Sequence, residues 1–155
     1  MKEKIAVFPG SFDPLTLGHQ DIVLRGLQIF DRIIIGVGSN SQKTNMFPIE
    51  KRTGWIKEVF KGNSGIHVET YEGLTVEFCK KNNAGYILRG LRTSADFEFE
   101  KAIAHMNAAI SENIESVFIL SDLRFAALSS SIVRDIIRNG GDARQFVPDA
   151  VKKNL

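Results

Sequence analysis

The chain has 155 residues, of which 43% are hydrophobic and 25% are charged, and its formal net charge at neutral pH is +2. These proportions are those of an ordinary globular protein, so they disfavour intrinsic disorder and a membrane protein, and so small a charge gives no argument for nucleic-acid binding. A chain of this length is expected to fold as one domain, residues 1–155, around a single core.

Predicted strands and helices alternate from the start of the sequence. The apolar run at residues 5–8 has the composition of a strand that is covered on both faces. Apolar residues then recur at helical spacing over 18–30, and a second buried strand follows at 32–38. Further helices are predicted at 48–61, 74–85, 94–110, 129–141 and 148–155, and further strands at 66–71, 86–90 and 116–120. This alternation predicts an α/β fold, a doubly wound five-stranded parallel sheet with helices on both faces.

The N-terminus and the cysteine content indicate a cellular compartment. The first apolar run is too short for a signal peptide, and no run approaches the ~20 apolar residues of a membrane-spanning helix. The single cysteine, Cys79, lies in an apolar-periodic stretch and is expected to be a buried thiol rather than part of a disulfide. We therefore expect a soluble protein of the cytoplasm.

The segments that follow the predicted strands are the most polar and glycine-rich parts of the chain. In order, they read PGSFDPLTLGH, SNSQKTNMF, EGL, RGLR and SDLRFAALSSS. Open parallel sheets bind ligands beyond the carboxyl ends of their strands. We therefore expect these five segments to converge on one ligand site.

The first of these segments, residues 9–19, is suited to binding an anion. Gly10 allows the backbone to approach a ligand closely, and Asp13-Pro14 favours a turn. His19 follows in the first turn of the next helix, whose unpaired N–H groups attract anions. A single histidine at such a place can also be purely structural.

Three stretches together resemble one enzyme family. PGSFDPLTLGH contains the Thr-x-Gly-His signature of the TxGH nucleotidyltransferase superfamily. With RGLRTSADFEFE followed by AHMN, and with SSSIVRDI, it is similar to the phosphopantetheine adenylyltransferases over essentially the whole chain. The resemblance implies a Rossmann-like nucleotidyltransferase domain that transfers the adenylyl group of ATP to 4′-phosphopantetheine, giving dephospho-coenzyme A and pyrophosphate in coenzyme A biosynthesis. It also implies a homohexamer, with no nucleic-acid or membrane partner.

The resemblance also implies which residues form the site. The reaction depends mainly on positioning and on stabilising charge, so it needs no protein nucleophile. The catalytic residues implied are His19, Lys43 and Arg92. The ATP contacts implied are Ser11, Phe12, His19, Gly90, Leu91, Arg92, Glu100, Phe125, Ala126, Ala127, Leu128, Ser129, Ser130 and Ser131. The contacts implied for the phosphopantetheine substrate are Ser11, Lys43, Leu74, Thr75 and Arg89.

No metal site is predicted from the protein's own side chains. One cysteine and three scattered histidines do not provide the ligand spacing of a zinc site. The cofactor implied by the family is Mg²⁺, which is expected to arrive with ATP and to be held mainly by phosphates and water.

Several of these residues also have simpler explanations. Most lysines are solvent-exposed, which would account for Lys43, and a solvated helix face would account for Glu100. A helix start would explain Thr75, and helix capping would explain one of the three serines. His105 matches the family, but it lies within a predicted helix beside Met106, and we interpret it as a packing or interface residue.

Two functional alternatives remain open at this point. A cytidylyltransferase for a small phosphorylated alcohol would share the first motif, but its last helix typically has a different signature. A nucleotide-binding sensor without turnover would use the same loops. The chain also departs from the family at two places: Phe99 stands where many relatives have tyrosine, and FAALSSS replaces an aromatic-rich approach to the serines.

Overall fold

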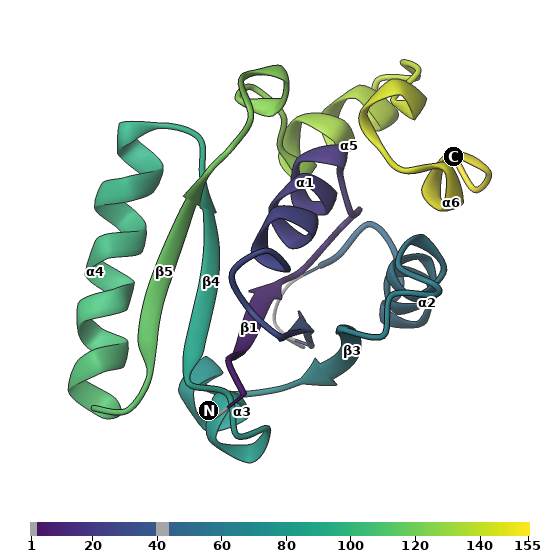
Figure 1. Ribbon diagram of the computed structural model, residues 1–155. Coiled ribbons are helices and arrows are strands. Elements are labelled where there is room, and N and C mark those ends of the chain that lie inside the picture. Colours follow the sequence, from purple (N-terminus) through teal and green to yellow (C-terminus); the bar gives the residue numbers. More distant parts are fainter. Residues whose placement is uncertain (1–2, 40–43) are drawn as a thin grey trace.

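All five predicted strands are present and form one parallel sheet (Figure 1). The computed structural model describes residues 3–39 and 44–155. The strands are β1 (Ile5–Gly10), β2 (Arg32–Gly38), β3 (Ile66–Tyr71), β4 (Tyr86–Leu91) and β5 (Glu115–Leu120). The α-helices are α1 (Leu17–Gly26), α2 (Ile49–Val59), α3 (Thr75–Lys81), α4 (Ser94–Ile110), α5 (Ser130–Arg138) and α6 (Asp149–Lys152). Short 3₁₀-helices cover Leu123–Phe125 and Arg144–Phe146.

The strand order is β3-β2-β1-β4-β5, so the direction of winding reverses between β1 and β4. β1 pairs with β2 along its whole length, from Ile5 to Gly10, but it pairs with β4 only at Ala6 and Val7. Beyond Val7 the two strands therefore separate and open a crevice at the carboxyl edge of the sheet. Such a switch point is where open α/β sheets bind their ligands.

Helices cover both faces of the sheet, as predicted. Side chains alternate along the strands, so Ala6 and Phe8 pack with α1, α2, α5 and α6, whereas Ile5 and Val7 pack with α3. Helix α4 runs beside β4 and β5 (Figure 1), and of its 17 residues only Glu100 is buried. Across the described residues, no helix has both the length and the apolar character needed to span a membrane.

The prediction of a buried thiol is confirmed. Cys79 is fully buried between α3 and the sheet, in the cluster that contains Val7, Ile34 and Val76. Burial raises the pKa of the thiol to about 12, because the thiolate would lose its hydration there. Cys79 is therefore protonated at neutral pH and serves as an apolar side chain.

The helix predicted over 94–110 coincides with α4, but the other five predicted helices are longer than the observed ones at their C-terminal ends. The prediction of a helix over 18–30 is wrong beyond Gly26. There the backbone N–H groups of Gln28 and Ile29 donate to carbonyls three residues earlier in the chain, instead of four as in an α-helix. Residues 82–85 leave the helical path at Asn83, whose φ of 53° is left-handed. Helix α5 ends before Gly140, whose φ is 75°. Apolar periodicity continues through these turns because residues such as Phe30 still face the core.

Candidate active site

The segments that follow β1, β4 and β5 meet at the switch point and form a cleft of about 570 Å³. The sequence-predicted residues that line it are Ser11, Phe12, His19, Arg89, Gly90, Arg92, Glu100, Phe125, Leu128, Ser129, Ser130 and Ser131. Three predicted ATP contacts, Leu91, Ala126 and Ala127, are absent from its described lining. Leu91 is buried in the protein instead.

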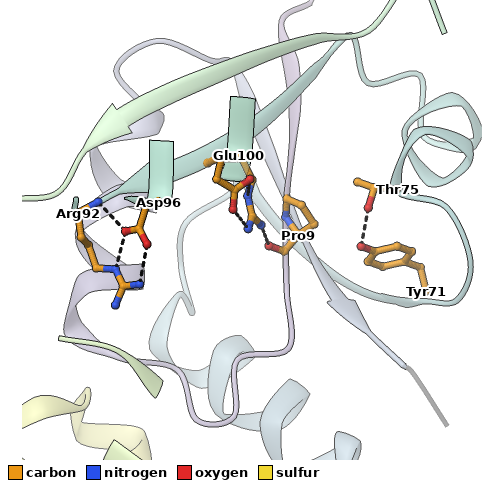
Figure 2. A network of polar contacts seen from close by, with 7 residues as sticks. Pro9, Tyr71, Thr75, Arg92, Asp96 and Glu100 are labelled. Carbon is orange, nitrogen blue, oxygen red and sulfur yellow. Dashed lines mark hydrogen bonds and ion pairs between the residues drawn. The ribbon is translucent and has the colours of Figure 1, made fainter. Parts of the chain in front are cut away.

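A second cavity of about 270 Å³ lies between α4 and the sheet and adjoins the cleft. Six residues line both spaces: Pro9, Gly10, Ser11, Asn45, Arg89 and Glu100. Thr75 lines this smaller cavity, where its hydroxyl is 2.9 Å from the hydroxyl of Tyr71 (Figure 2). Leu74, which was also predicted there, is 56% exposed and is absent from the described lining. Lys43 lies outside the described residues.

His19 is held by a capping box at the start of α1. Its backbone N–H donates to the hydroxyl of Thr16, and the backbone N–H of Thr16 donates to His19 Nδ1 at 3.0 Å. Since Nδ1 accepts a hydrogen bond, the ring proton is assigned to Nε2. The ring packs edge-on against Phe12, with 5.2 Å between the ring centroids.

The His19 ring is neutral in the free protein. Burial, together with the positive charges of Arg89 and Arg92, lowers its pKa to about 4, and burial is the largest of these causes. These two arginines therefore lie close enough to act on the ring electrostatically. A neutral ring with its proton on Nε2 can donate one hydrogen bond to an anion in the cleft without requiring an acidic pH.

This assignment predicts an NMR titration. We expect the His19 ring of the ligand-free protein to keep the chemical shifts of the Nε2–H tautomer from pH 8 down to pH 5 and to protonate near pH 4. Because folding lowers this pKa below 6.5, the contribution of the neutral ring to stability is complete above pH 6.5 and is lost as the pH falls towards 4. A His19→Ala spectrum identifies the resonance. Protonation between pH 6 and 7 would contradict the assignment.

Arg89 is fixed by three hydrogen bonds at the junction of the two cavities. Its Nε donates to Glu100 Oε2 at 2.9 Å, its Nη2 donates to Glu100 Oε1, and its Nη1 donates to the carbonyl of Pro9 at 2.6 Å. Figure 2 shows the Glu100 carboxylate and the Pro9 carbonyl converging on this guanidinium. The bond to Pro9 lies in the part of β1 that no longer pairs with β4. The hydrogen bond from Arg89 to Pro9 therefore bridges the opening of the crevice between β4 and β1.

Arg92 is oriented by a second carboxylate. Its backbone N–H, Nε and Nη2 all donate to Asp96, in the first turn of α4 (Figure 2). Its Nη1 donates to the carbonyl of Leu128 at 3.2 Å. Burial alone would raise the pKa of Asp96, but the hydrogen bonds from Arg92 outweigh that effect and lower it. Asp96 is therefore ionised at neutral pH, and Arg92 is held between the loops that follow β4 and β5.

The three serines at the start of α5 have different structural partners. Ser129 caps the helix by accepting from the N–H of Ile132, as helix capping predicts for one of them. Ser130 donates to the carbonyl of Pro14 at 2.8 Å, and Ser131 accepts from Arg134 at 3.1 Å. All three line the cleft, and the hydrogen bond of Ser130 ties the start of α5 to the first loop.

Two basic residues of the site were not identified from the sequence. Arg134 lines the cleft and donates to the carbonyl of Asp13 at 2.8 Å. A signal for it was present, because it follows Ser131 by three residues and so lies on the same face of the helix. Arg52, on α2, is 2% exposed and contacts the carbonyls of Ser11 and Phe47. Nothing local in the sequence distinguishes it from a surface arginine.

The arrangement of charges in the cleft is suited to binding phosphate groups. Arg89, Arg92 and Arg134 supply fixed positive charge, and α1 presents a neutral imidazole as a hydrogen-bond donor. The carboxylates that line the cleft, Asp13, Asp96 and Glu100, already accept hydrogen bonds from amides or arginines. This site can therefore hold phosphate groups and stabilise charge that develops on them.

A parallel α/β sheet with a Thr-x-Gly-His helix start and arginines at its switch point defines a nucleotidyltransferase. In agreement, the model of the family described as cytidylyltransferase-like matches residues 7–136. The fold is similar to a bifunctional NMN adenylyltransferase/ADP ribose pyrophosphatase from Francisella tularensis. The TM-score is 0.72 at 17% identity, and the match covers 94% of this chain and 45% of the other.

Curated relatives narrow the class to one family. A phosphopantetheine adenylyltransferase from Flavobacterium psychrophilum is 56% identical over 95% of this chain and 97% of the relative. Proteins of the same name from Christiangramia forsetii and Geotalea daltonii are 54% and 46% identical, over 97% and 100% of this chain and 99% and 96% of their own lengths. The chain belongs to the phosphopantetheine adenylyltransferase family.

Proposed function

We propose that this chain transfers the adenylyl group of ATP to 4′-phosphopantetheine, giving dephospho-coenzyme A and pyrophosphate. The observation that carries the proposal is that the smaller cavity meets the cationic cleft at Ser11 and Arg89. ATP and an acceptor phosphate must approach each other at one point, and the junction offers one. The names of the relatives support the identity of both substrates.

In this proposal the larger cleft holds ATP. Arg92, Arg134 and the serines at the start of α5 surround the triphosphate, and His19 Nε2–H donates to an oxygen of the α-phosphate. The bond strengthens as negative charge builds up in the transition state, which is the requirement for catalysis by differential binding. The acceptor phosphate attacks from the junction beside Arg89, and pyrophosphate leaves towards α5.

The smaller cavity suits the pantetheine arm. Ile87, Ile103 and Phe118 provide apolar walls, and the Tyr71–Thr75 hydroxyl pair and Asn107 provide polar groups. A narrow, mostly apolar space with a few polar groups matches a thin chain that contains two amides. Thr75 is thus proposed as an acceptor contact, and Leu74 is not.

Mg²⁺ is proposed to enter with ATP. In the described part of the chain no three His, Cys, Asp or Glu side chains form a group that could hold a metal ion. The carboxylates that line the cleft are already bonded to amides and arginines. We therefore propose that the phosphates and water coordinate the ion, which would neutralise part of the triphosphate charge.

Assembly as a homohexamer in the cytoplasm completes the proposal. Helix α4 supports the assembly because it leaves large apolar side chains uncovered. These are Phe97, Phe99, Ile103, Met106 and Ile110, which are 39–66% exposed. His105, on the same helix, is also exposed, which fits its interpretation as an interface residue.

Met106→Glu tests this assembly. We expect the particle mass measured by light scattering to fall from that of six chains to that of a smaller species, because a carboxylate would be buried without a partner in the interface. Lys57→Glu, on α2, is a control that changes a charge away from α4 and should leave the mass unchanged. A wild-type protein that is monomeric at micromolar concentration would refute the hexamer.

A substrate comparison tests the reaction itself. Pyrophosphate release is measured with ATP or CTP, each combined with 4′-phosphopantetheine or glycerol phosphate. We expect turnover only with ATP and 4′-phosphopantetheine. Preference for CTP and glycerol phosphate would show a cytidylyltransferase, and nucleotide binding without any pyrophosphate would show a sensor.

A further inference from the structure

A buried arginine connects two walls of the site without reaching either cavity. Arg52 is 2% exposed, although arginine is among the residues that are rarely buried. Its Nε donates to the carbonyl of Phe47 at 2.9 Å, and its Nη1 donates to the carbonyl of Ser11. Phe47 belongs to the segment before α2, and Ser11 belongs to the loop after β1. One guanidinium therefore joins two loops that are far apart in sequence.

Asp13 joins the same two loops, but its side chain starts from the loop after β1. Its side chain is buried, and its two oxygens accept from the backbone N–H groups of Met46, at 2.8 Å, and Phe47, at 2.9 Å. Arg52 extends from the α2 side to the first loop, and Asp13 extends from the first loop to the α2 side. The four hydrogen bonds all involve a charged group and are mostly shielded from water, which makes them stronger than neutral, exposed ones.

The two loops joined in this way form opposite parts of the junction. Ser11 and Asn45 both line the cleft and the smaller cavity. Residues 44–48 belong to no helix or strand, so their position relative to Ser11 depends on side-chain contacts. Transfer between two bound phosphates is sensitive to displacements of about 1 Å, which can cost roughly 10²-fold in rate.

We propose that Arg52 and Asp13 form a brace that sets the position of Asn45 relative to Ser11 and thereby the alignment of the two phosphates. This inference rests on the proposed function for its catalytic consequence. Both are positioning residues, because they act through the loops: Arg52 lines neither cavity, and both carboxylate oxygens of Asp13 accept from backbone N–H groups. Loss of the brace should therefore reduce kcat more than it weakens ATP binding.

The variants Arg52→Lys and Asp13→Asn test the brace. Lysine keeps the charge but lacks the planar fork that reaches two carbonyls, and the asparagine amide presents a donor to one of the two backbone N–H groups. We expect kcat to fall by about 10–100-fold, with the ATP dissociation constant changed less than about threefold. The double variant should be about as slow as the slower single variant. The two effects should not add, because each change already disables the same brace between the two loops.

A stability-matched control separates positioning from general destabilisation. Ile56→Val, in the same helix, removes a buried methylene and should lower the melting temperature while kcat stays unchanged. If kcat in the brace variants declines only as far as it does in an equally destabilised Ile56→Val protein, the brace is refuted.

Amide hydrogen exchange tests the brace independently of the reaction. We expect exchange at Met46 and Phe47 to be at least about tenfold faster in both brace variants than in the wild type, because their acceptors are lost or displaced. Unchanged exchange would overturn the brace even if the enzyme is active. Absence of wild-type turnover would instead refute the proposed function, and exchange would still decide whether the brace exists.

Discussion

Replacing His19 by alanine is expected to lower kcat by roughly 10²–10³-fold, the range found when one oxyanion donor is removed. The reason is that, in the proposed mechanism, the Nε2–H bond to the α-phosphate gains most of its strength in the transition state. The ATP dissociation constant, measured by calorimetry, should change only a few-fold, because Arg92, Arg134 and the start of α5 still hold the nucleotide.

His67→Ala provides the matched control for this change. His67 is exposed on β3, away from both cavities, so its removal should leave kcat and ATP binding unchanged. Loss of ATP affinity in parallel with kcat would show that His19 contributes uniform binding rather than transition-state stabilisation. An unchanged kcat in His19→Ala would remove the residue from the mechanism.

The second large effect is expected at the Arg89–Glu100 pair. Arg89→Met should reduce kcat/KM for 4′-phosphopantetheine by at least about 10²-fold, because the fixed cation at the junction is lost. It should also destabilise the protein by roughly 2–4 kcal/mol, because the Glu100 carboxylate, whose side chain is 10% exposed, loses its counter-ion. Urea unfolding and steady-state kinetics measure the two effects separately.

A double variant distinguishes the two roles of Arg89. In Arg89→Met/Glu100→Met no carboxylate remains buried without a partner, so we expect most of the lost stability to return. Activity should not return, because the cation at the junction is still missing. If activity recovered with stability, Arg89 would be only a structural partner of Glu100.

The sequence by itself determined the class of fold and the location of the site. Apolar runs at 5–8 and 32–38, separated by a helical pattern, require a parallel sheet with two covered faces, because both faces of such strands are apolar. In a parallel sheet the segments after the strands must lie at one edge, so the convergence of His19, Arg89 and Ser129 on one cleft followed from their places in the chain.

The tertiary structure decided which groups meet within that edge. Periodicity does not specify which strands are neighbours, so only the structure showed that β1 lies beside β4 and separates from it after Val7. The partners of charged side chains are equally non-local. The sequence implied a nucleotide contact for Glu100, with a solvated helix face as the alternative, and gave no sign that Glu100 and Asp96 orient Arg89 and Arg92.

Arg52 shows the physical reason most clearly. Burial of a charged side chain is favourable only when tertiary packing supplies enough hydrogen-bond partners to replace water, and those partners come from two other loops. A pattern along the chain records which positions are apolar and where helices start. It does not record the distances between loops, and those distances set the geometry in which two phosphates can react.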